Sequence, residues 1–147
     1  MLLRTNSDNP DFAKLTGELD IELCRIYNTN PEDYEEYNRI TNLPTVVLAY
    51  ENNRAVGCGC FKIVDKKTIE IKRMFIQEYH RKTGIASRIL AELETWAKEL
   101  GYSEAILETG KGQPQAINFY QKYGYQITDN YNQFDDLGIS VCLEKQF

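Results

Sequence analysis

The stretch from Thr68 to Ala86 constrains the fold of this chain more than any other. It begins with the strand-like run T-I-E-I-K-R-M-F-I, passes through a short basic loop, and enters the most helical segment of the chain at Gly84. A backbone that leaves a strand, turns through a glycine and enters a helix presents unpaired N–H groups at the positive end of that helix. The sequence therefore predicts an anion site, for a phosphate group in particular, at the start of this helix.

The residues before this stretch predict a strand, helical segments and an antiparallel meander. Met1–Arg4 has strand character, and an amphipathic helical pattern starts at Asp11. Asn30-Pro31 is typical of a second helix start, and the acidic residues that follow would complement the helix dipole and face water. Short polar turns separate three strands, Thr45–Tyr50, Ala55–Val64 and Thr68–Ile76. Because the turns are short, we expect these three strands to pair in antiparallel fashion.

The residues after Gly84 predict a helix that crosses the sheet to reach a parallel strand. Gly84–Leu100 is amphipathic, and Glu94 and Lys98 are spaced as an ion pair on its exposed side. Ala105–Thr109 is the next strand, and a strand, a crossover helix and a strand are most simply parallel. One more helix and two strands are predicted at Gln113–Gly124, Tyr125–Thr128 and Ile139–Leu143.

Length and charge exclude several classes of protein. The 147 residues are expected to form one domain, residues 1–147. The net charge of -5 argues against a nucleic-acid partner, since dedicated nucleic-acid binders are usually basic. No apolar run is long enough to cross a bilayer and no signal-peptide pattern is seen, so we expect a cytoplasmic protein without a membrane partner.

The cysteine pattern does not predict a metal site. Cys58 and Cys60 form C-G-C within a strand-like run, no C-x-x-C pair occurs, and the single histidine, His80, lies far away in the sequence. We therefore expect no metal, buried and reduced thiols, and a solvent-facing His80. The two glycines that alternate with these cysteines, Gly57 and Gly59, are typical of a bulge or of the close approach of another backbone.

Arg81, Gly84 and Ala86 form R-x-x-G-x-A between the strand and the helix. This motif resembles the coenzyme A signature Q/R-x-x-G-x-G/A of the GNAT family of N-acetyltransferases. The run E-I-K-R-M-F-I resembles the fourth strand of that family, and A-I-N-F-Y-Q-K-Y-G-Y, from Ala116 to Tyr125, resembles its fourth helix and the strand after it. About half of the chain, from Val46 to about Ile127, fits the family's order of elements.

The resemblance implies a fold and a donor. The fold would be a single α/β (α+β) domain with a mixed sheet, an antiparallel N-terminal meander, a parallel pair of strands that splay apart, and helices on both faces. The donor would be acetyl-CoA, with the pyrophosphate on the backbone N–H groups that lead into the helix. A plain strand–loop–helix turn capped near Thr83 is the structural alternative. The residues implied in donor binding are Met74, Phe75, Ile76, Arg81, Lys82, Thr83, Gly84, Ile85, Ala86 and Asn118.

The family's splayed strands also imply how the rest of the donor would bind. The pantetheine arm carries two amides and would pair with the exposed edge of the strand at Met74–Ile76. A backbone N–H near Met74 would face the thioester oxygen and stabilise oxyanion charge. Asn118 matches a side chain that often binds the arm.

Two residues are candidates for acid–base catalysis. Tyr120 occupies the position of the family's usual general acid, although its helical spacing is also that of a core aromatic residue. Glu70 could take the proton of the amine, although its alternation with Ile69 and Ile71 is equally expected of a half-exposed strand. Lys72 and Arg73 are interpreted as surface or acceptor-site charges rather than as catalysts.

The implied function is the transfer of an acetyl group to a primary amine, on a small molecule or a peptide, by direct attack in a ternary complex. A non-catalytic acyl-CoA sensor on the same fold is the alternative, whereas a dinucleotide-binding oxidoreductase is excluded by the lack of G-x-G-x-x-G. The acidic residues 32–36 with Tyr34 and Tyr37 would then lie at the acceptor site. The aromatic residues Tyr131 and Phe134 make a homodimer plausible.

Overall fold

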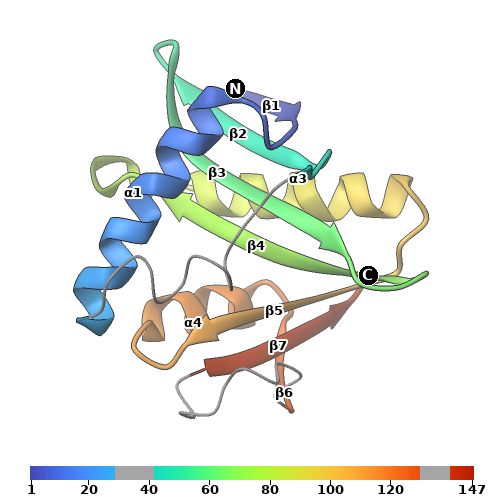
Figure 1. Cartoon of the computed structure of the whole chain (residues 1–147). Coiled ribbons are helices and arrows are strands. Elements are labelled where there is room, and N and C mark those ends of the chain that lie inside the picture. The colour runs from blue at the N-terminus through green and yellow to red at the C-terminus, as the bar shows by residue number, and fades with distance from the viewer. Residues whose placement is uncertain (29–41, 130–139) are drawn as a thin grey trace.

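A mixed sheet of seven strands runs through the part of the chain that the computed structural model describes, residues 1–28, 42–129 and 140–147 (Figure 1). The strands are β1 (Leu2–Thr5), β2 (Val46–Glu51), β3 (Arg54–Ile63), β4 (Thr68–Ile76), β5 (Glu104–Gly110), β6 (Gln126–Thr128) and β7 (Ser140–Gln146). The helices are α1 (Pro10–Tyr27), α3 (Ile85–Glu99), α4 (Pro114–Lys122) and the short 3-10 helix η2 (Glu78–His80). The predicted helix at Asn30-Pro31, the acidic residues 32–36, and the aromatic residues Tyr131 and Phe134 lie outside the described residues.

The order of the strands confirms the predicted topology. Across the sheet the order is β1-β2-β3-β4-β5-β7-β6. The strands β1 to β4 pair in antiparallel fashion, β4 and β5 are parallel, and β7 returns antiparallel between β5 and β6. The fold class expected from the sequence, a mixed sheet with an antiparallel N-terminal meander and one parallel pair, is therefore confirmed.

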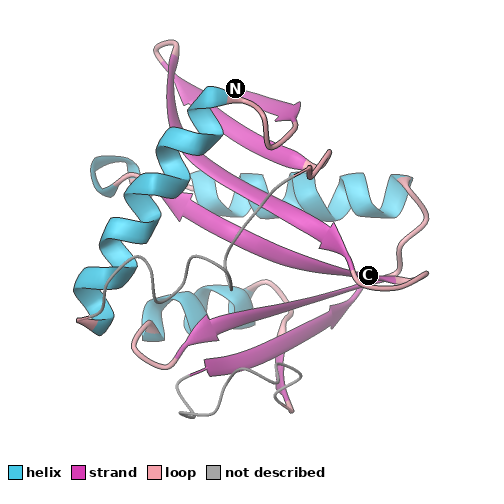
Figure 2. Ribbon diagram, viewed as in Figure 1, coloured by secondary structure: helices cyan, strands magenta, loops and turns pink. Residues whose placement is uncertain are grey.

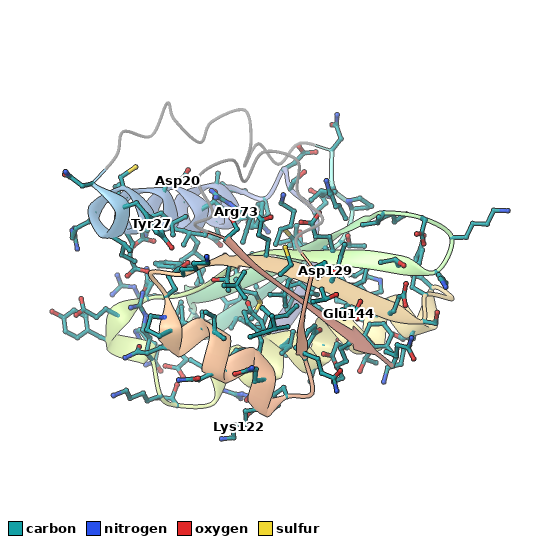
Figure 3. The ribbon with its side chains drawn as sticks, turned by 90° about the horizontal axis from the view of Figure 1, so that it is seen from below. Asp20, Tyr27, Arg73, Lys122, Asp129 and Glu144 are labelled. Atoms are coloured by element: carbon teal, nitrogen blue, oxygen red, sulfur yellow. The ribbon has the colours of Figure 1, made fainter. Side chains whose placement is uncertain are left out.

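Helices cover both faces of the sheet and define two hydrophobic clusters. On one face, α1 packs Phe12, Leu15 and Leu19 against β2 and β3. On the other face, α3 and α4 pack against a larger cluster that contains Ile89 and Leu93. Figure 3 shows this layering, with α1 on one side of the sheet and α4 on the other. None of the described helices has the length and apolar character required to span a membrane.

The glycines of β3 let α3 approach the sheet closely. A Cβ atom on Gly57 would lie 2.6 Å from Cδ1 of Ile76, and one on Gly59 would lie 2.5 Å from Sδ of Met74 and 3.0 Å from Cγ2 of Ile89. Larger side chains at either position would push α3 or β4 away. Of the two expectations for these glycines, the bulge is confirmed at Gly59, where the β3–β4 register shifts, whereas the closest neighbours of both glycines are side chains and not another backbone.

The predicted surface ion pair on α3 is wrong. Glu94 is only 8% exposed, and its carboxylate accepts a hydrogen bond of 2.8 Å from the hydroxyl of Tyr125 and pairs with Nζ of Lys145 at 2.9 Å. Tyr125 directly precedes β6 and Lys145 lies on β7, so the sequence of the helix alone could not indicate these partners. The buried carboxylate ties α3 to the C-terminal strands.

The parallel pair β4–β5 opens into a V. Its ladder joins Thr68–Ile71 to Glu104–Leu107 and ends there, although both strands continue. Figures 1 and 2 show the two strands close together at one end and far apart at the other. Beyond Ile71, no strand among the described residues pairs with the edge of β4 that faces β5.

Candidate active site

A β-bulge interrupts β4 just beyond the vertex of the V. Cys58 pairs with Phe75 and Cys60 with Lys72, so Gly59 alone lies opposite the two residues Arg73 and Met74. Arg73 adopts a left-handed conformation with a φ of 58°. A non-glycine residue in this region costs about 1–3 kcal/mol, and such strain is often found at functional sites.

The bulge explains the C-G-C pattern of β3. The thiol of Cys58 donates to the carbonyl of Arg73, and the thiol of Cys60 donates to the carbonyl of Lys72, both at 3.3 Å. Burial raises the pKa of both thiols, that of Cys60 to about 12. The two cysteines therefore stay protonated and support the bulge as weak donors, in agreement with the expectation of buried and reduced thiols.

Arg73 fastens the bulge to α1. Its side chain is only 7% exposed, pairs with Oδ1 of Asp20 at 2.8 Å and donates to the carbonyl of Thr16 at 3.2 Å. Figure 3 labels Asp20 on α1 next to Arg73, with Tyr27 on the same helix. Of the two interpretations, a surface charge or an acceptor-site charge, the first is wrong, because α1, which is distant in the sequence, covers Arg73.

A pocket of about 190 Å³ opens where β4 and β5 diverge. Its walls come from α1, β4, β5, β7 and the start of α4. The lining residues are Leu19, Leu23, Tyr27, Ile71, Lys72, Arg73, Met74, Leu107, Glu108, Thr109, Gly110, Gln113, Ala116, Tyr120 and Ser140. Of the residues that the sequence singled out, Met74 and Tyr120 meet in this pocket, together with Lys72 and Arg73.

Tyr120 lies at the boundary between the core and the pocket. It is 7% exposed, its ring packs edge-on against Phe119 and Tyr125, and it also lines the pocket. Among the described residues, its hydroxyl has no hydrogen-bond partner. Burial raises the pKa of this hydroxyl above its ordinary value, which keeps it protonated at neutral pH.

The two glutamates of the diverging strands differ in position. Glu70 is 8% exposed, pairs with Nζ of Lys62 at 3.5 Å, and is not among the lining residues of the pocket, so it is not the half-exposed residue expected from the alternation. Glu108 lines the pocket, and its carboxylate accepts a contact of 3.8 Å from the thiol of Cys142. Sequence analysis missed Glu108, although its strand pattern, L-E-T, resembles the I-E-I pattern around Glu70.

Lys72 contributes a cation to the same pocket. It is half-buried, and this burial lowers the pKa of its ammonium group. Together with Glu108 it gives the pocket charges of both signs close to the hydroxyl-bearing Tyr120. The pocket therefore combines a proton donor, a carboxylate and cationic side chains.

The start of α3 is an uncapped helix N-terminus. Gly84 is the N-cap residue, has a φ of 85°, and makes no side-chain capping bond. The first intrahelical bond runs from the N–H of Arg88 to the carbonyl of Gly84, so the preceding N–H groups of the first turn have no partner within the helix. No acidic residue occupies this first turn. The cap residue is Gly84, next to Thr83, and the Thr83 hydroxyl does not cap the helix because it donates to the carbonyl of His80 at 2.7 Å.

The basic residues of the loop differ in their contacts. Arg81 donates through Nε to the carbonyl of Ile76 and pairs with Glu22 of α1, both at 2.7 Å, whereas Lys82 is exposed and has a φ of 63°. His80 is half-buried and lies 2.9 Å from Glu51, so it is not simply solvent-facing. The guanidinium group of Arg81 thus connects the loop to α1.

The remaining candidates are placed as follows. Phe75 and Ile76 are buried on opposite faces of the sheet, so only their backbone can meet a ligand at the strand edge. Ile85 is buried, Ala86 is half-buried, and Asn118 is exposed on α4 and does not line the pocket. Within the described ranges, no group of three or more His, Cys, Asp or Glu side chains could hold a metal ion.

Comparison with known proteins identifies relatives of this arrangement. The model of the acetyltransferase (GNAT) family matches residues 15–125. The protein named "IAA acetyltransferase" from Azospirillum brasilense is 30% identical over 141 residues, which cover 90% of this chain and 88% of that protein. A GNAT acetyltransferase from Elizabethkingia anophelis, solved with acetyl-CoA bound, is similar at 29% identity and a TM-score of 0.63, covering 70% of this chain and 76% of that one. A GNAT acetyltransferase from Staphylococcus aureus shares the fold, with a TM-score of 0.78, 18% identity and 99% coverage of both chains.

Proposed function

The chain belongs to the acetyltransferase (GNAT) family and is an acyltransferase, and on this premise we propose that it transfers the acetyl group of acetyl-CoA to a primary amine. The reaction is a direct attack of the amine on the thioester, with donor and acceptor bound together in one domain formed by residues 1–147. The observation that carries this proposal is the pocket at the open V, where Tyr120, Glu108 and the bulge of β4 meet. The acceptor is a small amine or the amine of a peptide.

The diphosphate of the donor binds at the start of α3. The uncapped first turn supplies N–H donors and the positive end of the helix dipole, and the lack of acidic residues there leaves the charge uncompensated. A left-handed Gly84 turns the chain into this position. The acetyl-CoA bound by the relative from Elizabethkingia anophelis supports the same donor here.

The pantetheine arm lies along the free edge of β4. Because the β4–β5 ladder ends at Ile71, the backbone from Met74 to Ile76 can pair with the amides of the arm, except that the carbonyl of Ile76 already accepts from Nε of Arg81. The bulge turns one N–H near Met74 toward the thioester oxygen, where it stabilises the charge that develops during attack.

Tyr120 is the general acid that protonates the departing thiolate. Its raised pKa favours the protonated form, and among the described residues no partner competes for its hydroxyl. Asn118 is exposed on α4 and binds the part of the arm that lies outside the pocket.

Glu108 is the carboxylate that receives the proton of the attacking amine, directly or through water. It lines the pocket that holds Tyr120, whereas Glu70 is engaged with Lys62 outside the lining of that pocket. A base must come within hydrogen-bond reach of the proton that it abstracts, and geometry therefore favours Glu108. The sequence offered Glu70 as a candidate base and equally as an ordinary strand residue, and we assign the base to Glu108 on the next strand instead.

Replacing Glu108 with glutamine is expected to lower kcat by about 10²–10⁴-fold, because an amide cannot accept the proton of the amine. The KM for acetyl-CoA should change little. The same replacement at Glu70 should lower kcat by less than about threefold, since its exposed partner Lys62 contributes little. Steady-state kinetics of both variants, with Glu144→Gln on the exposed part of β7 as a matched control, decides between the two glutamates. A large loss in Glu70→Gln alone would return the role to Glu70.

Ligand-induced stabilisation tests the proposed donor. Acetyl-CoA at 100 times its Kd should stabilise the protein by about 2.7 kcal/mol and raise Tm by several degrees. NAD⁺, which carries a diphosphate but no pantetheine, should give a much smaller shift. Release of free thiol with a panel of small amines and peptides then measures turnover. Binding of acetyl-CoA without thiol release for any amine would instead favour a sensor of acyl-CoA.

A further inference from the structure

Two glycines, one at the end of β5 and one just beyond it, have no positive φ that would require glycine. Among the described glycines, positive φ values occur at Gly84, Gly101 and Gly124, and neither Gly110 nor Gly112 has one. Both face a side chain from a distant part of the chain. A Cβ atom on Gly110 would overlap the hydroxyl oxygen of Tyr27 and lie 2.6 Å from its Cζ, and one on Gly112 would lie 3.1 Å from its Cε1. The ring of Tyr27 therefore packs against the segment Gly110–Gly112, which we call the glycine seat.

Tyr27 reaches this seat because α1 crosses the open end of the V. It is the last residue of α1, which ends at the left-handed Asn28. Nearer its middle, three pairs of side chains attach α1 to the β4 side. These are Asp20 with Arg73, Glu18 with Gln77 and Glu22 with Arg81. At its end, Tyr27 attaches the helix to the β5 side, so α1 joins the two arms of the V.

The place of this contact relates it to the donor rather than to the reacting amine. Because β4 and β5 are parallel, their carboxyl ends lie at the same edge, and β4 leads from there into the loop before Gly84. Gly110 lies three residues beyond Leu107, where the ladder ends, which is about 10 Å along the strand. An arm that runs from the start of α3 to a thioester beside Tyr120 has to pass this edge.

We infer that Tyr27, seated on Gly110 and Gly112, is a binding residue for the pantetheine arm of the donor. Its ring closes the pocket on the side of α1 and lines it together with Thr109 and Gln113. The ring covers the apolar part of the arm and excludes water from the channel that leads to the thioester. The inference rests on the proposed function, since it assigns a wall to the donor site.

The test compares a ligand with the arm and a ligand without it. In Tyr27→Ala, the Kd for acetyl-CoA should rise by about tenfold, which corresponds to the loss of part of an aromatic contact. The Kd for 3′-phospho-ADP, which has the nucleotide and the diphosphate but no pantetheine, should change by less than about twofold by the same relation. Isothermal titration calorimetry measures both. Equal losses for the two ligands, or no loss for acetyl-CoA, would overturn the inference.

A double-mutant cycle shows whether the glycine seat acts through Tyr27. Gly110→Ala should displace the ring and weaken acetyl-CoA binding, but should add little in a Tyr27→Ala background, because no ring is then left to displace. Gly17→Ala is the matched control, since a Cβ there meets nothing within 4 Å. Circular dichroism and Tm verify that each variant is folded. If the wild-type protein binds neither ligand, the proposed donor is wrong, whereas unaltered binding in Tyr27→Ala contradicts only the role of Tyr27.

Discussion

Replacing Gly84 with glutamate should abolish donor binding and raise the Kd for acetyl-CoA by more than about 100-fold, equivalent to about 2.7 kcal/mol. Two effects act in the same direction. Gly84 has a φ of 85°, a conformation that L side chains rarely adopt, so the loop would shift to relieve the strain. The new carboxylate would also stand at the helix N-terminus that we propose for the diphosphate and would repel it. Titration of acetyl-CoA by calorimetry measures the loss.

Gly101 offers a matched control at the other end of the same helix. It also has a positive φ, 98°, and a Cβ there meets nothing within 4 Å, as is the case at Gly84. Gly101→Glu therefore carries the same new charge and a similar backbone strain, of about 1 kcal/mol or more. Both variants should lose stability, but only Gly84→Glu should lose the donor. Normal affinity in Gly84→Glu would mean that the diphosphate lies elsewhere.

Replacing Tyr120 with phenylalanine should lower kcat by about 100-fold or more and leave the KM for acetyl-CoA nearly unchanged. The ring keeps its place in the core, and the hydroxyl has no partner to lose among the described residues. Because burial raises its pKa, wild-type activity should not decline on the basic side through ionisation of Tyr120 within the usual assay range. Steady-state rates across pH test both statements.

Tyr125 provides the contrasting variant. Its hydroxyl donates to the buried carboxylate of Glu94 at 2.8 Å, and it is not among the residues that line the pocket. Tyr125→Phe should therefore cost about 1.5–3 kcal/mol of stability, as expected for a hydrogen bond to a charged group, with kcat preserved. Tyr120→Phe should show the opposite result, a stable protein with a slow reaction. Unchanged turnover in Tyr120→Phe would exclude this residue as the acid.

Patterns local to the chain predicted most of the fold. The alternation in Thr68–Ile76, the amphipathic run after Gly84 and the short turns of the meander all reflect periods of a few residues. The uncapped start of α3 belongs to the same class, because a glycine with positive φ and a first turn without acids are properties of adjacent residues. The parallel β4–β5 pair followed from the length of the crossover.

Charged residues were harder to place, since their partners come from other elements. Glu94 and Lys98 have the spacing of a surface pair, yet Glu94 is buried against Tyr125 and Lys145. The local sequence pattern likewise could not decide whether Glu70 or Glu108 is the general base. Both alternate with other residues in a strand, and only the point at which the β4–β5 ladder ends determines which of them borders the pocket.

The sequence by itself determined the order of the elements and the loop that enters α3, because these depend on neighbours along the chain. The tertiary structure decided the active-site geometry, above all the bulge at Arg73. Strict alternation would place Met74 on the face of Lys72, but Met74 packs with Ile71 and Ile76 on the side of α3, because the bulge inserts one residue. The bulge lies opposite Gly59 on β3. The thiols of Cys58 and Cys60 donate to its carbonyls, and α1 binds the side chain of Arg73. No window of adjacent residues contains all of these partners.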